Sequence, residues 1–170
     1  MTESLALARY SQRMPSELVW VVPFAKYAHV ATMFAAATIQ VGADLYFLKV
    51  AEDGDAQTTA RLGHAVRRRG PITGPILEIG IAFGVITALI GGFNLLAPWL
   101  LASYIVIALG TVSVFRWAAP AFTALLEAAD AGDDARIAAL LAQGPYRPAA
   151  LANAAMYAVV IFLMVVKPLS

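Results

Sequence analysis

The chain has no cysteine, only two histidines and few charged residues. Without cysteine it can form no disulfide, thiolate metal site, iron–sulfur cluster or cysteine nucleophile. Charged residues make up 14% of the sequence, against roughly a quarter in soluble domains. The net charge of +1 provides no strong electrostatic attraction for nucleic acid, so we expect no nucleic-acid partner.

Apolar residues dominate the composition instead. They form 61% of the 170 residues, and the mean hydropathy is +0.73. A soluble core of this size could not bury so many apolar side chains, whereas a lipid bilayer solvates them. The length corresponds to one domain, so residues 1–170 are predicted to form a single integral membrane domain.

Four apolar segments are each long enough to cross a bilayer, because about twenty helical residues span its hydrocarbon core. They cover residues 22–49, 72–94, 98–119 and 148–166. The second and third are separated by a very short turn and should form a tight hairpin. The sequence therefore predicts an all-α, polytopic membrane protein, an up-and-down bundle of four transmembrane helices.

Basic residues are distributed unequally between the two sides of these spans. Eight flank one side and four flank the other, and the richer side is normally cytoplasmic. The eight are Lys49, Arg61, Arg67, Arg68, Arg69, Arg116, Arg136 and Arg147, and the four are Arg9, Arg13, Lys26 and Lys167. We therefore expect a multi-pass protein of the bacterial cytoplasmic (inner) membrane with both termini extracytoplasmic.

Both cytoplasmic connections are predicted to contain short helices. Asp55 is placed to cap a helix that runs to about Arg69. A helical pattern continues over residues 120–129, and a break at residues 130–134 precedes a further short helix.

That further helix is amphipathic and should end at Gly144–Pro145. Its apolar face carries Ile137, Leu140 and Leu141. We expect this face to lie on the membrane surface, or alternatively to bind a partner.

The first apolar segment carries a stripe of polar and sulfur-containing side chains. Its members are Lys26, His29, Met33, Gln40 and Asp44, which lie within about 80° of one another around a helix. Because ionisable groups in lipid are costly, such a stripe normally faces protein or water. Any chemistry of the chain is expected here.

Asp44 lies at a depth similar to that of Glu78 in the second span and Arg116 in the third. Two carboxylates and a guanidinium can neutralise one another where water is scarce. We predict a structural ion cluster that sets helix register. A proton or cation pathway, or side chains that reach out to the headgroups, are the alternatives.

His29 is the only histidine within a predicted span. It is expected to be a hydrogen-bonded packing residue or, alternatively, a haem ligand with Met164 of the fourth span as the second axial ligand. Met164 belongs to a stripe on the fourth span that also includes Asn153, Tyr157 and Lys167. The two stripes suggest that spans one and four face a common interior. We find too few ligands for a zinc site.

The second span has a face of small residues formed by Gly80, Gly84 and Gly91 together with Thr87. The spacing of Gly80 and Gly84 is the small-xxx-small pattern that lets helices approach closely. We expect these glycines to pack against a helix of the same chain, with a homodimer or a larger complex as the alternative.

The motif Phe24-Ala-Lys26-Tyr-Ala-His29-Val, with Leu45-Tyr46 and Pro98-Trp99-Leu100, resembles a family of small four-helix bacterial integral membrane proteins of unknown function. The likeness covers roughly residues 22–120. More remotely, the chain is similar to the membrane domain of copper-resistance protein D and to HemJ-type protoporphyrinogen oxidases. The latter resemblance implies haem b binding by the first-helix histidine, which here is His29.

Three functions fit these observations. We favour a non-catalytic membrane protein, not an enzyme, that is an accessory or stabilising subunit of a larger inner-membrane assembly such as a respiratory or photosynthetic one. A haem-binding redox protein that uses His29 is the first alternative. A small proton or cation transporter that uses Asp44, Glu78 and Arg116 is the second. The expected partners are the lipid bilayer and other membrane subunits or further copies of the chain.

Overall fold

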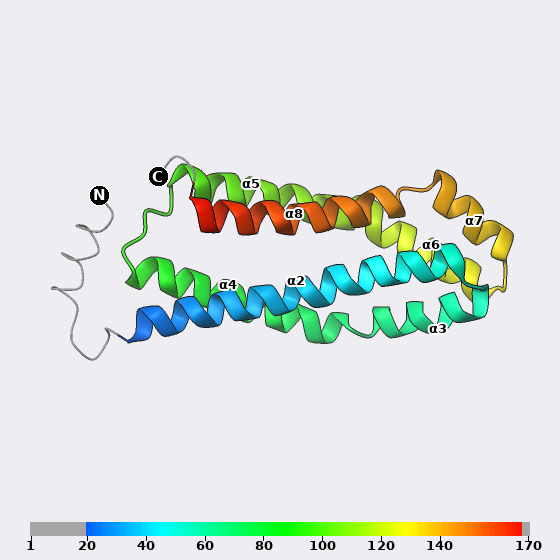
Figure 1. The fold of residues 1–170 in the computed structure, drawn as a ribbon, viewed down its shortest axis with the longest axis horizontal. Coiled ribbons are helices and arrows are strands. Elements are labelled where there is room, and N and C mark those ends of the chain that lie inside the picture. Colours follow the sequence, from blue (N-terminus) through cyan, green and yellow to red (C-terminus); the bar gives the residue numbers. More distant parts are fainter. Residues whose placement is uncertain (1–19, 168–170) are drawn as a thin grey trace. The chain divides into compact units, whose positions relative to one another are not determined.

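The computed structural model describes residues 20–167, and within them every regular element is a helix (Figure 1). The elements are α2 (Val21–Asp53), α3 (Ala56–Arg67), α4 (Gly70–Ile90), α5 (Pro98–Ser113), the π-helical turn η2 (Val114–Ala118), α6 (Ala119–Asp130), α7 (Asp134–Gln143) and α8 (Tyr146–Val166). The predicted all-α membrane bundle is confirmed.

Each of the four predicted spans lies on a helix long and apolar enough to cross a membrane. Two of these helices extend further at their C-terminal ends than predicted. The helix α2 continues to Asp53, and α5, η2 and α6 follow one another without a break from Pro98 to Asp130. The helix α4 instead ends at Ile90, short of the predicted residue 94, because Gly92 adopts a positive φ of 65° just after it.

The described residues fall into two compact units, and each is described by itself. The first contains α2 up to Ala36 together with residues 72–96. The second contains the remainder of α2, α3, and everything from Ala97 onward. Whether residues 1–170 act as one domain stays a prediction.

In the first unit, α2 and α4 pack closely along the faces that carry His29 and the glycines. The ring of Phe24 meets that of Phe83 edge to face at a centroid distance of 6.2 Å. Added Cβ atoms at Gly80 and Gly84 would lie 2.8 Å from the Met33 sulfur and 2.8 Å from the His29 ring. A larger residue at either position would force neighbouring side chains or the helices themselves to shift.

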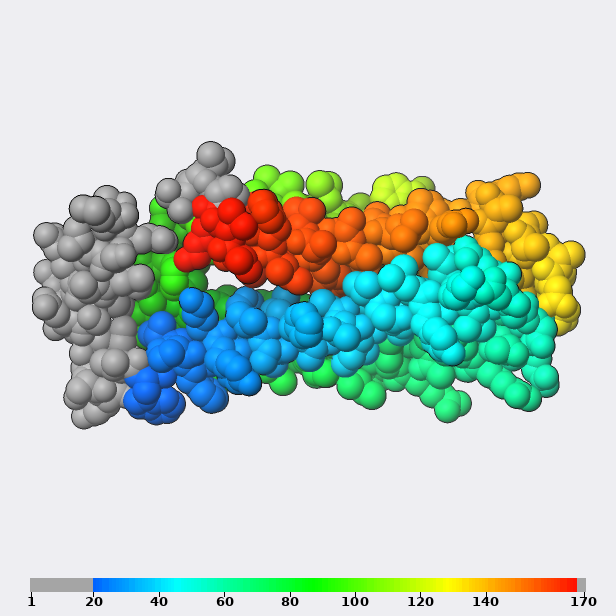
Figure 2. Space-filling model, viewed as in Figure 1, coloured from blue at the N-terminus to red at the C-terminus, as the bar shows by residue number. Residues whose placement is uncertain are grey.

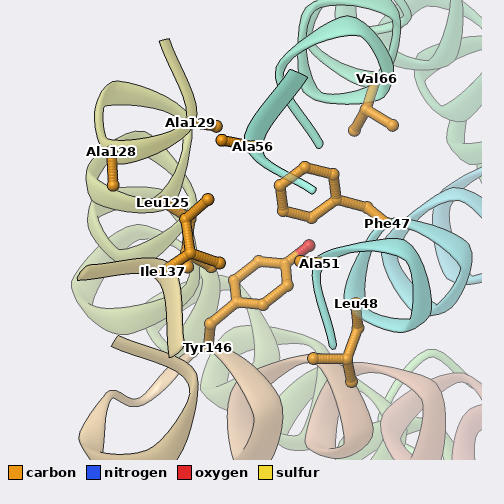
Figure 3. Packing of buried hydrophobic residues seen from close by; sticks show 10 residues of the cluster. All are labelled: Phe47, Leu48, Ala51, Ala56, Val66, Leu125, Ala128, Ala129, Ile137 and Tyr146. Atoms are coloured by element: carbon orange, nitrogen blue, oxygen red, sulfur yellow. The ribbon is translucent and has the colours of Figure 1, made fainter. Parts of the chain in front are cut away.

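The second unit has an apolar core where the connecting helices meet, which we call the connector core. Its buried members are Phe47, Leu48, Ala51, Ala56, Val66, Leu125, Ala128, Ala129, Ile137 and Tyr146. Figure 3 shows Tyr146 and Leu125 reaching toward Phe47 from separate helices. The rings of Phe47 and Tyr146 meet edge to face at 5.6 Å. This packing holds α3, α6 and α7 against the end of α2.

Short acidic side chains fix the ends of the connecting helices. Asp55 caps α3, as predicted, and accepts a 2.6 Å hydrogen bond from the Thr58 backbone N–H. Asp133 caps α7 in the same way through the N–H of Arg136, at 2.9 Å. Asp134 accepts from the Ala56 N–H at 2.7 Å and so ties the start of α7 to the start of α3.

The helix α7 has the bounds and the apolar face that the sequence predicts, but its face has a different role. Ile137 is buried in the connector core, and Leu140 and Leu141 pack against that core. The predicted contact with the membrane surface or with a partner is corrected for Ile137, because protein covers this residue. Leu140 and Leu141 are half-buried, and for them that contact stays a prediction.

The helices α5 and α8 lie side by side in the second unit (Figure 1). Met156 of α8 packs directly on Gly110 of α5, where an added Cβ would force the methionine side chain to shift. At the far end, the Lys167 ammonium lies 5.6 Å from the centre of the Trp99 ring. The other side of α8 forms the continuous ridge coloured orange to red in Figure 2.

Candidate functional site

Asp44, the most buried carboxylate for which the structure gives an ion pair, lies in the second unit on α2. One of its oxygens forms an ion pair with the Arg69 guanidinium, and each of the two side chains is 15% exposed. The other oxygen accepts hydrogen bonds from the Gln40 amide at 2.9 Å and the Asn153 amide at 3.3 Å. We call these four residues the Asp44 network.

Both terminal nitrogens of the Arg69 guanidinium form bonds. It also donates to the backbone carbonyl oxygens of Ile39 and Gln40 on α2, at 3.5 Å and 3.4 Å. These carbonyls lie within a helix, so the guanidinium adds bonds to oxygens that already accept from the backbone. Arg69 thus fixes the junction between α3 and α4 to the middle of α2.

The predicted ion cluster is corrected in its cation. The guanidinium beside Asp44 belongs to Arg69, whereas Arg116 lies on η2 with an exposed side chain and forms no ion pair with Asp44. Glu78 is also exposed, and it belongs to the first unit, whereas Asp44 belongs to the second. Its proposed association with Asp44 stays a prediction.

Sequence analysis counted Arg69, with Arg67 and Arg68, only among the basic residues that flank the spans. The feature that distinguishes Arg69 from its basic neighbours is its position. It directly precedes α4 and follows the amphipathic helix α3. Asn153 was identified correctly as part of a polar stripe on the fourth span. Its bond to Asp44 confirms that α2 and α8 share a polar contact at this depth.

His29 is half-buried against α4 in the first unit. Its Nδ1 lies 2.7 Å from the backbone oxygen of Gly80. A carbonyl oxygen only accepts, so Nδ1 carries the proton and donates it. The predicted hydrogen-bonded packing role is therefore confirmed, and Nε2 is left as the available ring nitrogen in the neutral form.

The remaining predicted residues occupy different places. Lys26 is exposed, whereas Met33 is half-buried against Gly80. Met164 is half-buried on α8 in the second unit, so its pairing with His29 stays a prediction.

The predicted glycine face divides into two roles. Gly80 and Gly84 pack against α2 of the same chain, as expected. Gly91 does not: the atoms nearest to its added Cβ are the Thr87 carbonyl and the Phe93 ring, both of its own segment. Its role is corrected to ending α4, where its N–H bonds to Thr87 at 2.8 Å.

The Asp44 network is an electrically neutral pair with its hydrogen bonds largely satisfied. Such an arrangement joins helices; a carboxylate already opposed by a guanidinium is poorly suited to bind a further cation. Among residues 20–167 there is also no cluster of three or more histidine and carboxylate side chains able to hold a metal ion. Comparison with protein-family models, with curated proteins and with solved structures gives no match to this chain.

Proposed function

We propose that the chain is a non-catalytic accessory or stabilising subunit of a larger assembly in the bacterial inner membrane. The observation that carries this proposal is the use of its intramembrane polar groups. Arg69 and Asn153 both bond to Asp44, and His29 bonds to Gly80. These polar groups thus serve to hold helices together.

The outward surfaces of the spans support the same proposal. Large apolar side chains are exposed along all four, including Phe34 at 65%, Leu89 at 63%, Phe115 at 75% and Val165 at 75%. Lipid covers such surfaces, and helices of other membrane subunits pack on them equally well. The connector core is already well packed, so a partner could bind to it without any change in its fold.

The test is purification from native membranes at natural expression level in a mild detergent. We expect a stoichiometric membrane companion. The variants Phe34→Ala and Phe115→Ala remove exposed rings from different helices, and loss of the companion from one but not the other would locate the interface. A chain that purifies alone, and whose deletion leaves all membrane complexes intact, would contradict the proposal.

A haem-binding redox function is the second candidate, and one observation favours it. Histidines that bind metals commonly donate their other ring N–H to a backbone carbonyl, as His29 does to Gly80. The haem would be held through Nε2 of His29, with Met164 as the proposed second ligand, and would supply one-electron chemistry.

This second candidate is tested by the visible absorption spectrum of protein expressed with added haem. A Soret band that disappears in His29→Ala and shifts in Met164→Ala supports it. An absence of the band from the wild-type protein would exclude it. Leu163→Ala, adjacent to Met164 on α8, serves as the matched control.

A further inference from the structure

The second unit contains a pocket of about 330 Å³ between η2, α6, α7 and the start of α8. Its walls are mainly apolar and include Ala121, Ala124, Leu125 and Leu140. Arg116 and Trp117 line the same pocket from η2. The Arg116 guanidinium therefore borders a pocket whose lining is otherwise mainly apolar.

Arg116 is the charged group of this pocket. Its side chain is exposed, and within residues 20–167 the structure gives it no ion pair or hydrogen bond. Its neighbour Trp117 is 46% exposed. Both belong to the π-helical turn, and such turns are frequent at functional sites because they shift side chains relative to a regular helix.

The depth of Arg116 follows from the length of the helix that leads to it. It lies eighteen residues after Pro98, which corresponds to about 27 Å at 1.5 Å per residue. The hydrocarbon core of a bilayer is about 30 Å thick. With Trp99 near one border, Arg116 and Trp117 therefore reach the other border, where lipid phosphates and interfacial tryptophans lie.

We propose that this pocket binds one anionic phospholipid from the adjacent leaflet. The Arg116 guanidinium holds the phosphate, and the apolar walls on α6 and α7 receive the glycerol and the beginning of an acyl chain. A guanidinium matches the geometry of phosphate oxygens, and it is not neutralised here by an acidic neighbour. A free phosphate ion would contact only one cation in this pocket and would leave its apolar walls uncovered. A lipid, which has both a phosphate and apolar groups, therefore fits the lining better.

The experiment is a native mass spectrometry titration of the detergent-purified chain with phosphatidylglycerol and, separately, with phosphatidylcholine. We expect one phosphatidylglycerol to bind in preference. Arg116→Glu should weaken this binding roughly tenfold or more, because a charge-assisted phosphate contact is replaced by repulsion. Ala124→Leu, which fills part of the pocket and keeps Arg116, should also weaken it.

The matched control is Arg61→Glu, which makes the same charge reversal at an exposed position on α3 outside the pocket lining. It should bind phosphatidylglycerol like the wild type. Equal loss in Arg61→Glu would indicate general attraction to charge and would overturn the proposal, as would unchanged binding in Arg116→Glu. Displacement of the lipid by inorganic phosphate would identify a free-ion site instead. If Ala124→Leu fails to fold, Ala121→Leu tests the same wall, and unchanged binding in the folded variant would contradict the proposed pocket.

Discussion

Asp44 gathers three side-chain donors from separate parts of the chain. Gln40 comes from one turn earlier on the same helix, Arg69 from the junction before α4, and Asn153 from α8. A carboxylate this poorly hydrated is stabilised only while its partners remain in place, because an unpaired buried charge is costly. The network therefore couples three segments through one residue.

Replacing Arg69 with Gln should destabilise the fold by about 2 kcal/mol, because it leaves the Asp44 carboxylate without its cation. Asp44→Asn should have a similar effect, and the double variant should cost less than the sum of the two. The measurement is the unfolding midpoint in detergent.

The neighbouring Arg68→Gln is the control, since Arg68 is exposed and should change stability little. Arg116→Gln is expected to behave like this control. Equal midpoints for Arg69→Gln and Arg68→Gln would show that the pair contributes nothing to stability.

At the level of helices, the α2–α4 contact depends on the absence of side chains at two positions. Gly84→Ala would place a methyl group 2.8 Å from the His29 ring. The helices must separate or the ring must rotate, and we expect a loss of about 1–3 kcal/mol. Thermal unfolding in detergent measures it.

Gly42→Ala is the matched control for this prediction. It lies within α2, and no atom comes within 4 Å of an added Cβ there, so stability should be unchanged or slightly higher. The combination of Gly84→Ala with His29→Ala should cost less than the sum of its members, because the smaller residue leaves room for the methyl group. Strict additivity would argue against this contact.

The start of α3 depends on the charge of Asp55. The backbone N–H of Thr58 donates to this carboxylate and lowers the pKa of Asp55 below its ordinary value. A group with a lowered folded-state pKa stabilises the fold above its unfolded pKa, near 3.8, and this contribution is lost as the pH falls through the lower folded value.

Asp55→Asn keeps a capping side chain but cannot change its charge. We expect the wild type to have the higher unfolding temperature at neutral pH, with the difference between the two proteins disappearing in acid below that window. A difference that stays constant down to the lowest pH would show that the charge of Asp55 has no part in capping.

For the whole molecule, helix length separates the part within lipid from the part outside it. The 33 residues of α2 extend about 50 Å, against about 30 Å of hydrocarbon. The connector core is built at the far end of this helix, around Phe47 and Ala51. The tight packing of the described chain is thus concentrated where two helices extend beyond the bilayer. There the connecting helices pack on them.

We propose that this connector end is cytoplasmic, following the excess of basic residues on that side. A reporter active only in the cytoplasm should give a strong signal when inserted at Gly132, in the turn between α6 and α7, and a weak one when fused after Ser170. The opposite pattern would reverse the orientation.

Much of the fold could be predicted because the information for it is local. A run of apolar residues is sufficient to define a span, and Asp55 and Gly144 mark helix ends through bonds to residues nearby in sequence. The partner of Asp44 could not be predicted in this way. Arg69 is separated from it by 25 positions and a turn, and periodicity within one helix carries no information about such a contact.

The amino-acid sequence by itself determined the class of protein, its four spans and the helices of its connections, since each follows from side chains acting on their own neighbourhood or on lipid. Only the tertiary structure decided that Arg69 neutralises Asp44, that His29 bonds to Gly80 and that the apolar face of α7 packs on protein. These three outcomes depend on which helix faces come together. Packing between segments distant in sequence sets that choice, because several faces are equally apolar and only the fit of side chains distinguishes them.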